Sequence, residues 1–203
     1  MKNFNDTIQW YDEHAKDYST ASFQTASVEL IDTFLNYLPS HPTILDAGCG
    51  SGRDCDLMAK KGASMIGLDL SKGLLREAKR KYPHIDFVGA NFLDIPFEKE
   101  TFDGVWAHAA LVHLETVEDV KKSLEEFYRV LKKKGILHIY VREIPPIDEK
   151  DLIYDKERFF RYFTKEEMEG YIKDSGFTIK DSFLRQRKGG RQGLRWVCIF
   201  AQK

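Results

Sequence analysis

A run of small residues between a short apolar strand and a helix constrains this chain more than any other feature. The strand begins at Thr43-Ile44-Leu45, and the run that follows is Asp46-Ala47-Gly48-Cys49-Gly50-Ser51-Gly52. Glycines at such a junction let the backbone turn sharply and come close to a ligand. Helical spacing resumes at Arg53, and the start of a helix favours an anionic group. The pattern therefore predicts a ligand-binding turn between a strand and a helix.

The spacing of the glycines narrows the class of ligand. A dinucleotide fingerprint needs a third glycine where Arg53 stands, and the chain contains no Gly-Lys-Ser/Thr of a phosphate-binding loop. A nucleophile elbow would need glycines at the positions of Cys49 and Arg53. The pattern that remains, Asp-x-Gly-x-Gly-x-Gly after a strand, resembles the first motif of the class I S-adenosylmethionine (SAM)-dependent methyltransferases.

Three later segments resemble further motifs of that family. Asp69 ends a second apolar run, at the place where an acidic residue of the family accepts hydrogen bonds from the ribose hydroxyls. Asn91 and Phe92 stand in a segment that resembles the adenine-binding motif, with Asn where the family usually carries Asp. Residues 102–108 resemble the fourth strand, and residues 130–137 resemble the turn into the fifth. The resemblance runs from about residue 11 to the C-terminus, with the motifs in the family's order.

The resemblance implies a set of residues that contact the cofactor. The glycine turn would line the amino-acid end of SAM, Arg53 would help to hold its carboxylate, and Asp69 would bind the ribose. Asn91 and Phe92 would lie at the adenine. The complete predicted set is Tyr11, Tyr18, Asp46, Gly48, Cys49, Gly50, Gly52, Arg53, Asp69, Leu70, Asn91, Phe92 and Ala107. The cofactor implied is SAM, and the product is S-adenosylhomocysteine.

Three residues are candidates for a role in catalysis. Methyl transfer depends mainly on aligning nucleophile, methyl carbon and sulfur, and such proximity can supply roughly 7–11 kcal/mol without a catalytic triad. His108 and His113 follow the fourth strand, and either could take a proton from an acceptor because imidazole titrates near neutrality. For His113, which lies between two apolar residues, a hydrogen-bonded core position is the alternative. Tyr18 is the third candidate.

The N-terminal residues resemble the lid of many small-molecule methyltransferases of the family. The pattern is Tyr11-Asp12-x-x-Ala15-x-x-Tyr18, in which the second tyrosine of the family reaches the methyl donor or the acceptor. Ordinary packing of an aromatic helix face is the alternative for both tyrosines. No metal site is expected, because a spacing of five residues does not place His108 and His113 on one face of a helix.

The acceptor is harder to define than the cofactor. The residues His108-Ala109-Ala110-Leu111 replace the Asn/Asp-Pro-Pro-Tyr/Phe of DNA amino-methylating enzymes, so a DNA substrate is not expected. Arg142, Arg161, Tyr162 and Arg195 are the candidate substrate contacts, and their charge would suit an anionic small molecule. RNA is disfavoured by a net charge of −1 and by the lack of a separate nucleic-acid module.

Composition is that of an ordinary globular protein. The chain has 203 residues, of which 42% are hydrophobic and 31% charged, enough for one domain with a sizeable core. No apolar run approaches the roughly 20 residues of a membrane-spanning helix, and no apolar signal core is evident. The three cysteines lack Cys-x-x-Cys spacing. These features favour a cytoplasmic protein with reduced thiols, no membrane partner, and a monomeric or homodimeric state.

The periodicity of apolar residues predicts an alternation of strands and helices. Helices are expected at 6–18, 25–37, 53–61, 71–81, 116–132 and 164–175, and strands at 43–47, 64–69, 85–89, 102–107, 135–141, 177–184 and 194–201. Asp6 or Thr7 is expected to cap the first helix, and Thr164 with Glu167 to form a capping box at the start of the last. Such alternation predicts right-handed crossovers and a mostly parallel sheet with helices on both faces. The last two strands resemble the family's final hairpin, which has one antiparallel strand.

The sequence therefore predicts one Rossmann-like α/β domain over residues 1–203, with a seven-stranded sheet. Residues 1–38 would form the N-terminal helical lid, and residues 143–163 a cap insertion over the acceptor pocket. The predicted activity is transfer of a methyl group from SAM to O or N of a small molecule. Two rival hypotheses are a SAM-binding protein without catalysis and a nucleotide-dependent oxidoreductase, which the absence of the third glycine of the fingerprint disfavours. An RNA-directed methyltransferase is a further alternative.

Overall fold

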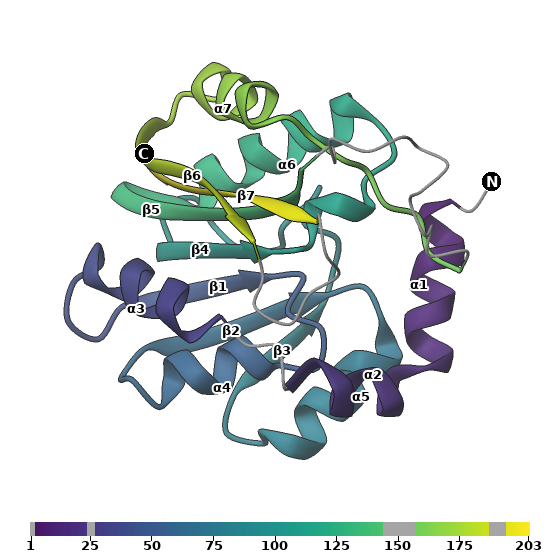
Figure 1. Ribbon diagram of the computed structural model, residues 1–203. Helices are drawn as coiled ribbons and strands as arrows, with labels where there is room; N and C mark the ends of the chain where they lie inside the picture. The colour runs from purple at the N-terminus through teal and green to yellow at the C-terminus, as the bar shows by residue number, and fades with distance from the viewer. Residues whose placement is uncertain (1–2, 24–26, 144–156, 187–193) are drawn as a thin grey trace.

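The computed structural model describes residues 3–23, 27–143, 157–186 and 194–203 of the chain (Figure 1). Its strands are β1 (Thr43–Ala47), β2 (Ser64–Asp69), β3 (Asp86–Gly89), β4 (Phe102–His108), β5 (Leu131–Arg142), β6 (Thr178–Gln186) and β7 (Arg195–Gln202). Its helices are α1 (Phe4–Glu13), α2 (Ala15–Phe23), α3 (Val28–Asn36), α4 (Arg53–Ala59), α5 (Lys72–Lys81), the short 3₁₀ helix η1 (Leu111–His113), α6 (Val117–Val130) and α7 (Lys165–Asp174).

Seven strands form one sheet in the order β3-β2-β1-β4-β5-β7-β6. All neighbours pair in parallel except β7, which is antiparallel to both β5 and β6. Helices α6 and α7 cover one face of the sheet, and α4 and α5 cover the other (Figure 1). The prediction of a mostly parallel, Rossmann-like sheet with one antiparallel strand is confirmed. The order of the strands reverses between β1 and β4, which is where parallel α/β sheets bind ligands.

The N-terminal helix is shorter than predicted and differently capped. The predicted helix over 6–18 is in fact two helices, α1 and α2, because the turn residue His14 separates them. Its cap is Asn3 rather than Asp6 or Thr7: the Asn3 side chain accepts from the Asp6 N–H, and the Asp6 carboxylate accepts from the Asn3 N–H. The helix therefore begins two residues earlier, with Asp6 as the capping-box partner.

Two further predictions about elements have clear outcomes. The capping box of α7 is confirmed, because the Thr164 hydroxyl accepts from the Glu167 N–H and the Glu167 carboxylate accepts from the Thr164 N–H. The predicted strand over 135–141 begins earlier, at Leu131, because Leu131 pairs with Phe102 before the register shifts at Gly104. Most of the predicted cap insertion, residues 144–156, lies outside the described residues.

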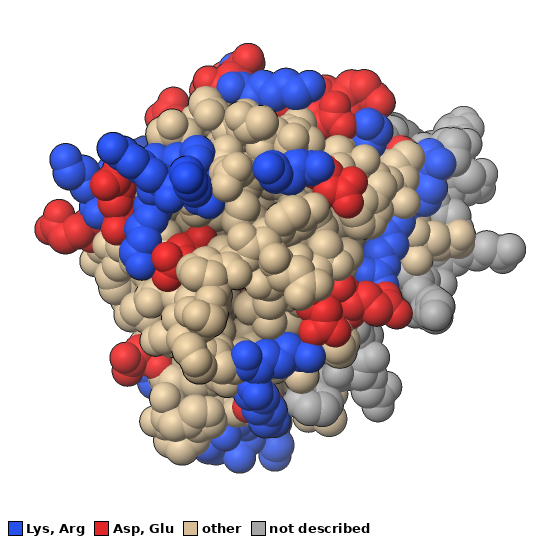
Figure 2. Space-filling view, turned by 90° about the vertical axis from the view of Figure 1, so that its left-hand side faces the viewer, with Lys and Arg blue, Asp and Glu red and all other residues tan. Residues whose placement is uncertain are grey.

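The surface at the end of the sheet away from α1 carries charges of both signs. Figure 2 shows the face on the left of Figure 1, away from α1, where lysine and arginine side chains alternate with acidic ones around an uncharged area. Among the described residues, the exposed large apolar side chains are Val28, Tyr37 and Leu184. Within the described part of the chain, no helix is long and apolar enough to cross a membrane.

Candidate functional site

The glycine turn after β1 depends on residues without a side chain. Gly48, Gly50 and Gly52 have φ angles of 83°, 54° and 81°, in the left-handed region that favours glycine. A Cβ atom on Gly48 would lie 2.5 Å from the Cβ of Ala110, which follows β4. The turn is tied to β2, because the N–H groups of Gly48 and Cys49 donate to the Leu68 carbonyl at 2.8 and 3.0 Å. The sequence therefore brings the ends of β1, β2 and β4 together at this turn.

Asp69 lies directly beside the glycine turn, as the sequence analysis requires. Its Oδ2 accepts from the Gly50 N–H at 2.8 Å, and its Oδ1 accepts from the Ser71 N–H at 2.8 Å. The side chain is half-buried, and burial raises the pKa of its carboxyl above the usual value despite these two hydrogen bonds. A carboxylate oxygen has two lone pairs, so each oxygen can accept a second hydrogen bond.

Two cavities open on either side of this turn. The apolar cavity has about 610 Å³ of space, including the part open to solvent. Its walls are formed by Phe4, Ile8, Tyr11, Tyr18, Gly48, Gly50, Asp69, Leu70, Leu74, Phe92, His108, Ala109, Ala110 and His113. The size is that of an ordinary small-molecule site, and most of its lining residues are apolar or aromatic.

The polar cavity is smaller, about 380 Å³ including its open part. It is lined by Tyr18, Ser22, Asp46, Gly48, Cys49, Gly50, Ser51, Arg53, Asp54 and His108. Four residues line both cavities: Tyr18, Gly48, Gly50 and His108. The two cavities therefore meet at the glycine turn, and one elongated ligand could occupy both.

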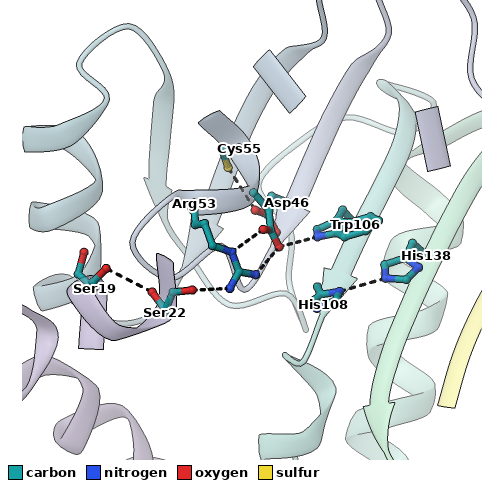
Figure 3. Close-up of polar contacts among 9 residues, drawn as sticks. Ser19, Ser22, Asp46, Arg53, Cys55, Trp106, His108 and His138 are labelled. Carbon is teal, nitrogen blue, oxygen red and sulfur yellow. Dashed lines mark hydrogen bonds and ion pairs between the residues drawn. The ribbon is translucent and has the colours of Figure 1, made fainter. Parts of the chain in front are cut away.

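Buried charges dominate the polar cavity (Figure 3). The Arg53 guanidinium donates to both oxygens of Asp54, from Nε at 2.6 Å and from Nη2 at 2.8 Å, and from Nη1 to the Ser22 carbonyl at 3.0 Å. Trp106 Nε1 donates to Asp54 Oδ2 at 3.1 Å. Burial alone would raise the pKa of Asp54, but Arg53 outweighs it and the pKa lies below the usual value.

Asp46 adds a second carboxyl to the same cavity. It is 2% exposed, and burial followed by the nearby Asp54 charge raises its pKa well above the usual value. The Cys55 thiol lies 3.2 Å from Asp46 Oδ2. Burial also raises the pKa of the Cys49 thiol to about 11, so this cysteine is a weak nucleophile at neutral pH. With two carboxyls and one guanidinium, the cavity suits a zwitterion better than a simple anion.

Helices α1 and α2 close one side of the apolar cavity. Asp12 anchors them, because its Oδ1 accepts from the Ser71 hydroxyl at 2.7 Å and from the Gly73 N–H at 2.6 Å. Gly73 permits this close approach, since a Cβ at that position would lie 2.7 Å from the Asp12 carbonyl oxygen. The ring of Tyr18 meets that of Tyr11 edge-on, with their centres 5.0 Å apart.

Replacing Asp12 by Ala is expected to loosen α1 and α2 from α5. The change removes the acceptor of two hydrogen bonds, one of them from the buried Ser71 hydroxyl, at a cost of about 1–3 kcal/mol. Amide hydrogen exchange of residues 4–23 should accelerate by at least tenfold, while exchange in β4 and β5 stays unchanged. The matched control is Asp17→Ala, at an exposed position of α2. Equal exchange in both variants would show that Asp12 does not anchor these helices.

His113 belongs to a hydrogen-bonded chain that joins three segments. Its Nδ1 lies 2.8 Å from the Phe159 carbonyl, which can only accept, so Nδ1 carries a proton. Its Nε2 lies 3.1 Å from the Tyr11 hydroxyl, which also accepts from Arg158 at 3.0 Å. The neutral ring can therefore only accept from Tyr11 at Nε2. Both ring nitrogens have partners, but the side chain is only half-buried and lines the apolar cavity, so the catalytic role of His113 stays a prediction beside the alternative of a hydrogen-bonded core residue.

His108 occupies a different position, at the junction of the two cavities. Its Nδ1 lies 3.2 Å from Nε2 of His138, a fully buried residue in the middle of β5 (Figure 3). His138 is not among the site residues predicted from the sequence. Its one signal was a lone histidine at alternate spacing in an apolar strand, which does not distinguish a core residue from a functional one.

The two residues predicted to contact the adenine line different cavities. Phe92 is buried and lines the apolar cavity. Asn91 instead lines a separate cavity together with Phe4, and its side-chain oxygen accepts from the Leu93 N–H at 3.0 Å. Ala107 is fully buried in β4 and is not among the residues that line the two cavities, whereas Leu70 lines the apolar one.

The four predicted substrate contacts are engaged with other protein groups, and none is among the described residues that line the two cavities. Arg142 lies over the ring of Phe160, 3.5 Å from its centre, and hydrogen bonds Tyr162. Arg161 donates to main-chain carbonyls of the loop after η1. Arg195 forms an ion pair with Glu143, at 2.5 Å from Nε to Oε2. Their binding of a substrate remains a prediction.

Within the four described ranges, no three His, Cys, Asp or Glu side chains gather closely enough to hold a metal ion.

Known proteins that resemble this chain are methyltransferases. A family model described as a methyltransferase domain matches residues 45–139. The chain is 34% identical over 131 residues to a tRNA (carboxymethyluridine(34)-5-O)-methyltransferase of Arabidopsis thaliana, covering 64% of this chain and 31% of that protein. It is 37% identical over 105 residues to a demethylmenaquinone methyltransferase of Chlorobaculum tepidum, covering 51% of this chain and 42% of that one. The chain thus spans less than half the length of these relatives.

Solved structures share the fold at lower identity. A 1,6-didemethyltoxoflavin-N1-methyltransferase of Burkholderia thailandensis, with its substrate and S-adenosylhomocysteine bound, superposes with a TM-score of 0.77 and 21% identity. That match covers 97% of this chain and 86% of the other. A [4+2]-cyclase also superposes, with a TM-score of 0.73 and 18% identity over 89% of this chain and 82% of the other.

The family model covers the stretch in which the sequence motifs, the glycine turn and the β1–β4 switch point coincide. The structural neighbours carry the same seven-stranded fold. The chain is thus similar to a methyltransferase domain over residues 45–139, and it shares its fold with SAM-dependent methyltransferases of known structure.

Proposed function

We propose that this protein binds SAM across the two cavities and transfers its methyl group to O or N of a small-molecule acceptor. The observation that carries the proposal is the position of Asp69 beside the glycine turn, where the apolar and polar cavities meet. The match of residues 45–139 to a methyltransferase-domain model supports the same activity.

The residues present fit the chemical parts of SAM. The Asp69 carboxylate has lone pairs for the ribose hydroxyls, and Phe92 offers an apolar surface for the adenine. Asp46 and Asp54 suit an ammonium group, and Arg53 suits a carboxylate, so the polar cavity matches the zwitterionic amino-acid end. The N–H groups of Gly48, Cys49 and Gly50 already donate within the protein, so the turn contributes shape rather than those three donors.

The bound cofactor would supply an electrophilic methyl group on a sulfonium. The protein must then hold the acceptor in line with that methyl group and keep water away from it. Tyr11, Tyr18 and the apolar side chains Phe4 and Ile8 line the side of the cavity that α1 and α2 cover, which suits this task. These helices and residues 157–163 would act as lid and cap over the acceptor, as the sequence predicts.

A small acceptor agrees best with this shape. The relatives reported above act on a demethylated menaquinone and on tRNA by name, so the family alone does not choose between small and large acceptors. The apolar cavity is small and lies under α1, and the net charge of −1 offers no general attraction for RNA. The [4+2]-cyclase of the same fold shows why turnover must be measured and not inferred from shape.

The proposed function is tested in two steps with the full chain. Isothermal titration calorimetry should detect SAM and S-adenosylhomocysteine with one site each, and NAD should give no heat. Methyl transfer from radiolabelled SAM should then be scored with a panel of small phenols, amines and carboxylates and with bulk tRNA. Absence of SAM binding at millimolar ligand would refute the proposal. Binding without transfer to any member of the panel would favour a SAM-binding protein without catalysis, and transfer to tRNA alone would refute the small-molecule acceptor.

A further inference from the structure

His138 is a buried polar residue that the proposed chemistry has not used. It is fully buried in β5, and the ring of Trp106 stacks on it with centres 3.8 Å apart. Phe200 and Phe34 lie on its other sides, at 4.9 and 6.2 Å between ring centres. Among the described residues, its one polar contact is the hydrogen bond to His108.

The surroundings of His138 determine where its proton sits. Burial, followed by the neighbouring His108, lowers the pKa of His138 well below its usual value, so the ring is neutral and carries one proton. Its Nδ1 is buried and has no hydrogen-bond partner in the described ranges. A proton on Nδ1 would leave a buried N–H without an acceptor, and such orphaned donors are rarer than orphaned acceptors. The proton therefore belongs on Nε2, which donates to Nδ1 of His108.

The proton on Nε2 of His138 determines the tautomer of the neighbouring His108. Because Nδ1 of His108 accepts from His138, a neutral His108 must carry its own proton on Nε2. Tyr140 stacks on the His108 ring with centres 4.2 Å apart, and Trp106 lies parallel to it at 5.2 Å. His108 lines both cavities, and an N–H group at its Nε2 is directed away from His138, which lies at its Nδ1.

We propose that His138 is a positioning residue that holds His108 as the Nε2–H tautomer, so that His108 presents a hydrogen-bond donor, and not a general base, where the two cavities meet. The donor takes an oxygen lone pair, from a carboxylate or a carbonyl. That oxygen belongs either to the amino-acid end of the cofactor or to the acceptor. This second part rests on the proposed function, whereas the tautomer itself does not.

The tautomer can be read without any ligand. We would record ¹⁵N–¹H correlation spectra of histidine-labelled protein at pH 7.5, with His108 assigned by its loss in His108→Phe. Wild-type His108 is expected to show a protonated Nε2 and an unprotonated Nδ1. His138→Gln, whose amide N–H can replace the donor, should keep that pattern, and His138→Phe should give a mixture of tautomers. A protonated Nδ1 on wild-type His108, or an unchanged pattern in a folded His138→Phe, would overturn the proposal.

Comparing two ligands tests which molecule supplies the oxygen that accepts from His108. S-adenosylhomocysteine and 5′-methylthioadenosine share the adenosine, but the second lacks the amino-acid end. If His108 binds the cofactor carboxylate, His108→Phe should weaken S-adenosylhomocysteine about tenfold and leave 5′-methylthioadenosine unchanged. If it binds the acceptor, both affinities should stay constant and the KM for the acceptor should rise by a similar factor. Unchanged affinities together with an unchanged KM would refute a donor role at either ligand.

Discussion

Replacing Asp69 by Asn is expected to weaken SAM binding by about 100-fold while leaving the protein folded. A hydrogen bond to a charged group contributes about 1.5–3 kcal/mol, and each 1.4 kcal/mol is a factor of ten in affinity. Asn keeps one acceptor oxygen, but that oxygen must also receive the Gly50 or Ser71 N–H, so little capacity remains for a ribose diol. Calorimetric titration with SAM measures the change directly.

The stability of this variant separates the binding role from a structural one. The pKa of Asp69 is higher in the folded protein than in the unfolded chain, so its contribution to stability is largest at low pH. That contribution is lost as the pH rises through the folded pKa, and the ionised side chain is therefore unfavourable at pH 7. Asn at this position should leave Tm at pH 7 unchanged or slightly higher. The control is Asp86→Asn, at an exposed position of β3, with unchanged SAM affinity. Wild-type affinity in Asp69→Asn would contradict the assigned role.

Replacing Asp54 by Ala should produce the largest loss of stability. The change leaves the Arg53 guanidinium without its paired carboxylate and removes the acceptor of the Trp106 N–H. Breaking a buried ion pair by removing one partner costs about 3–5 kcal/mol. For a chain of this size that lowers Tm by roughly 10 °C. Differential scanning calorimetry at pH 7 is the measurement.

Two comparisons keep this result interpretable. Lys61→Ala removes an ion pair with Asp32 in which both side chains are exposed, and it should change Tm little. Replacing Arg53 and Asp54 together by Leu should recover much of the loss, because no unpaired charge then remains. The pKa of Asp54 is lower in the folded protein than in the unfolded chain, so its stabilisation is present above about pH 4 and is lost as the pH falls through the folded pKa. A Tm of Asp54→Ala equal to that of the wild type would show that the pair does not stabilise the fold.

Much of the fold could be predicted because each signal was local. The period of the apolar residues gave the strands and helices, and Thr164 with Glu167 gave the capping box of α7. The break at His14 was missed because nothing in the residues around it, neither Gly nor Pro, interrupts a helical pattern. The break instead accompanies the anchoring of Asp12 on α5, a contact between segments about sixty residues apart.

The part of the site that belongs to the sequence motifs could be predicted. The positions of Gly48 and Asp69 follow from a turn and a strand end that lie next to each other in any sheet of this topology. The partners of His113 and His108 did not follow, because they come from residues 159 and 138, which only the folded chain brings near. The contacts of Arg142 and Arg195 could not be predicted either, since a positive charge in a sequence does not reveal which carboxylate or ring it meets.

The most direct test of this account is a crystal structure of the protein with S-adenosylhomocysteine. We expect both ribose hydroxyls within hydrogen-bonding distance of the Asp69 carboxylate, the adenine against Phe92, and the amino-acid end in the cavity lined by Arg53 and Asp46. A ligand bound elsewhere, or one whose ribose does not reach Asp69, would contradict the claim that one molecule spans both cavities.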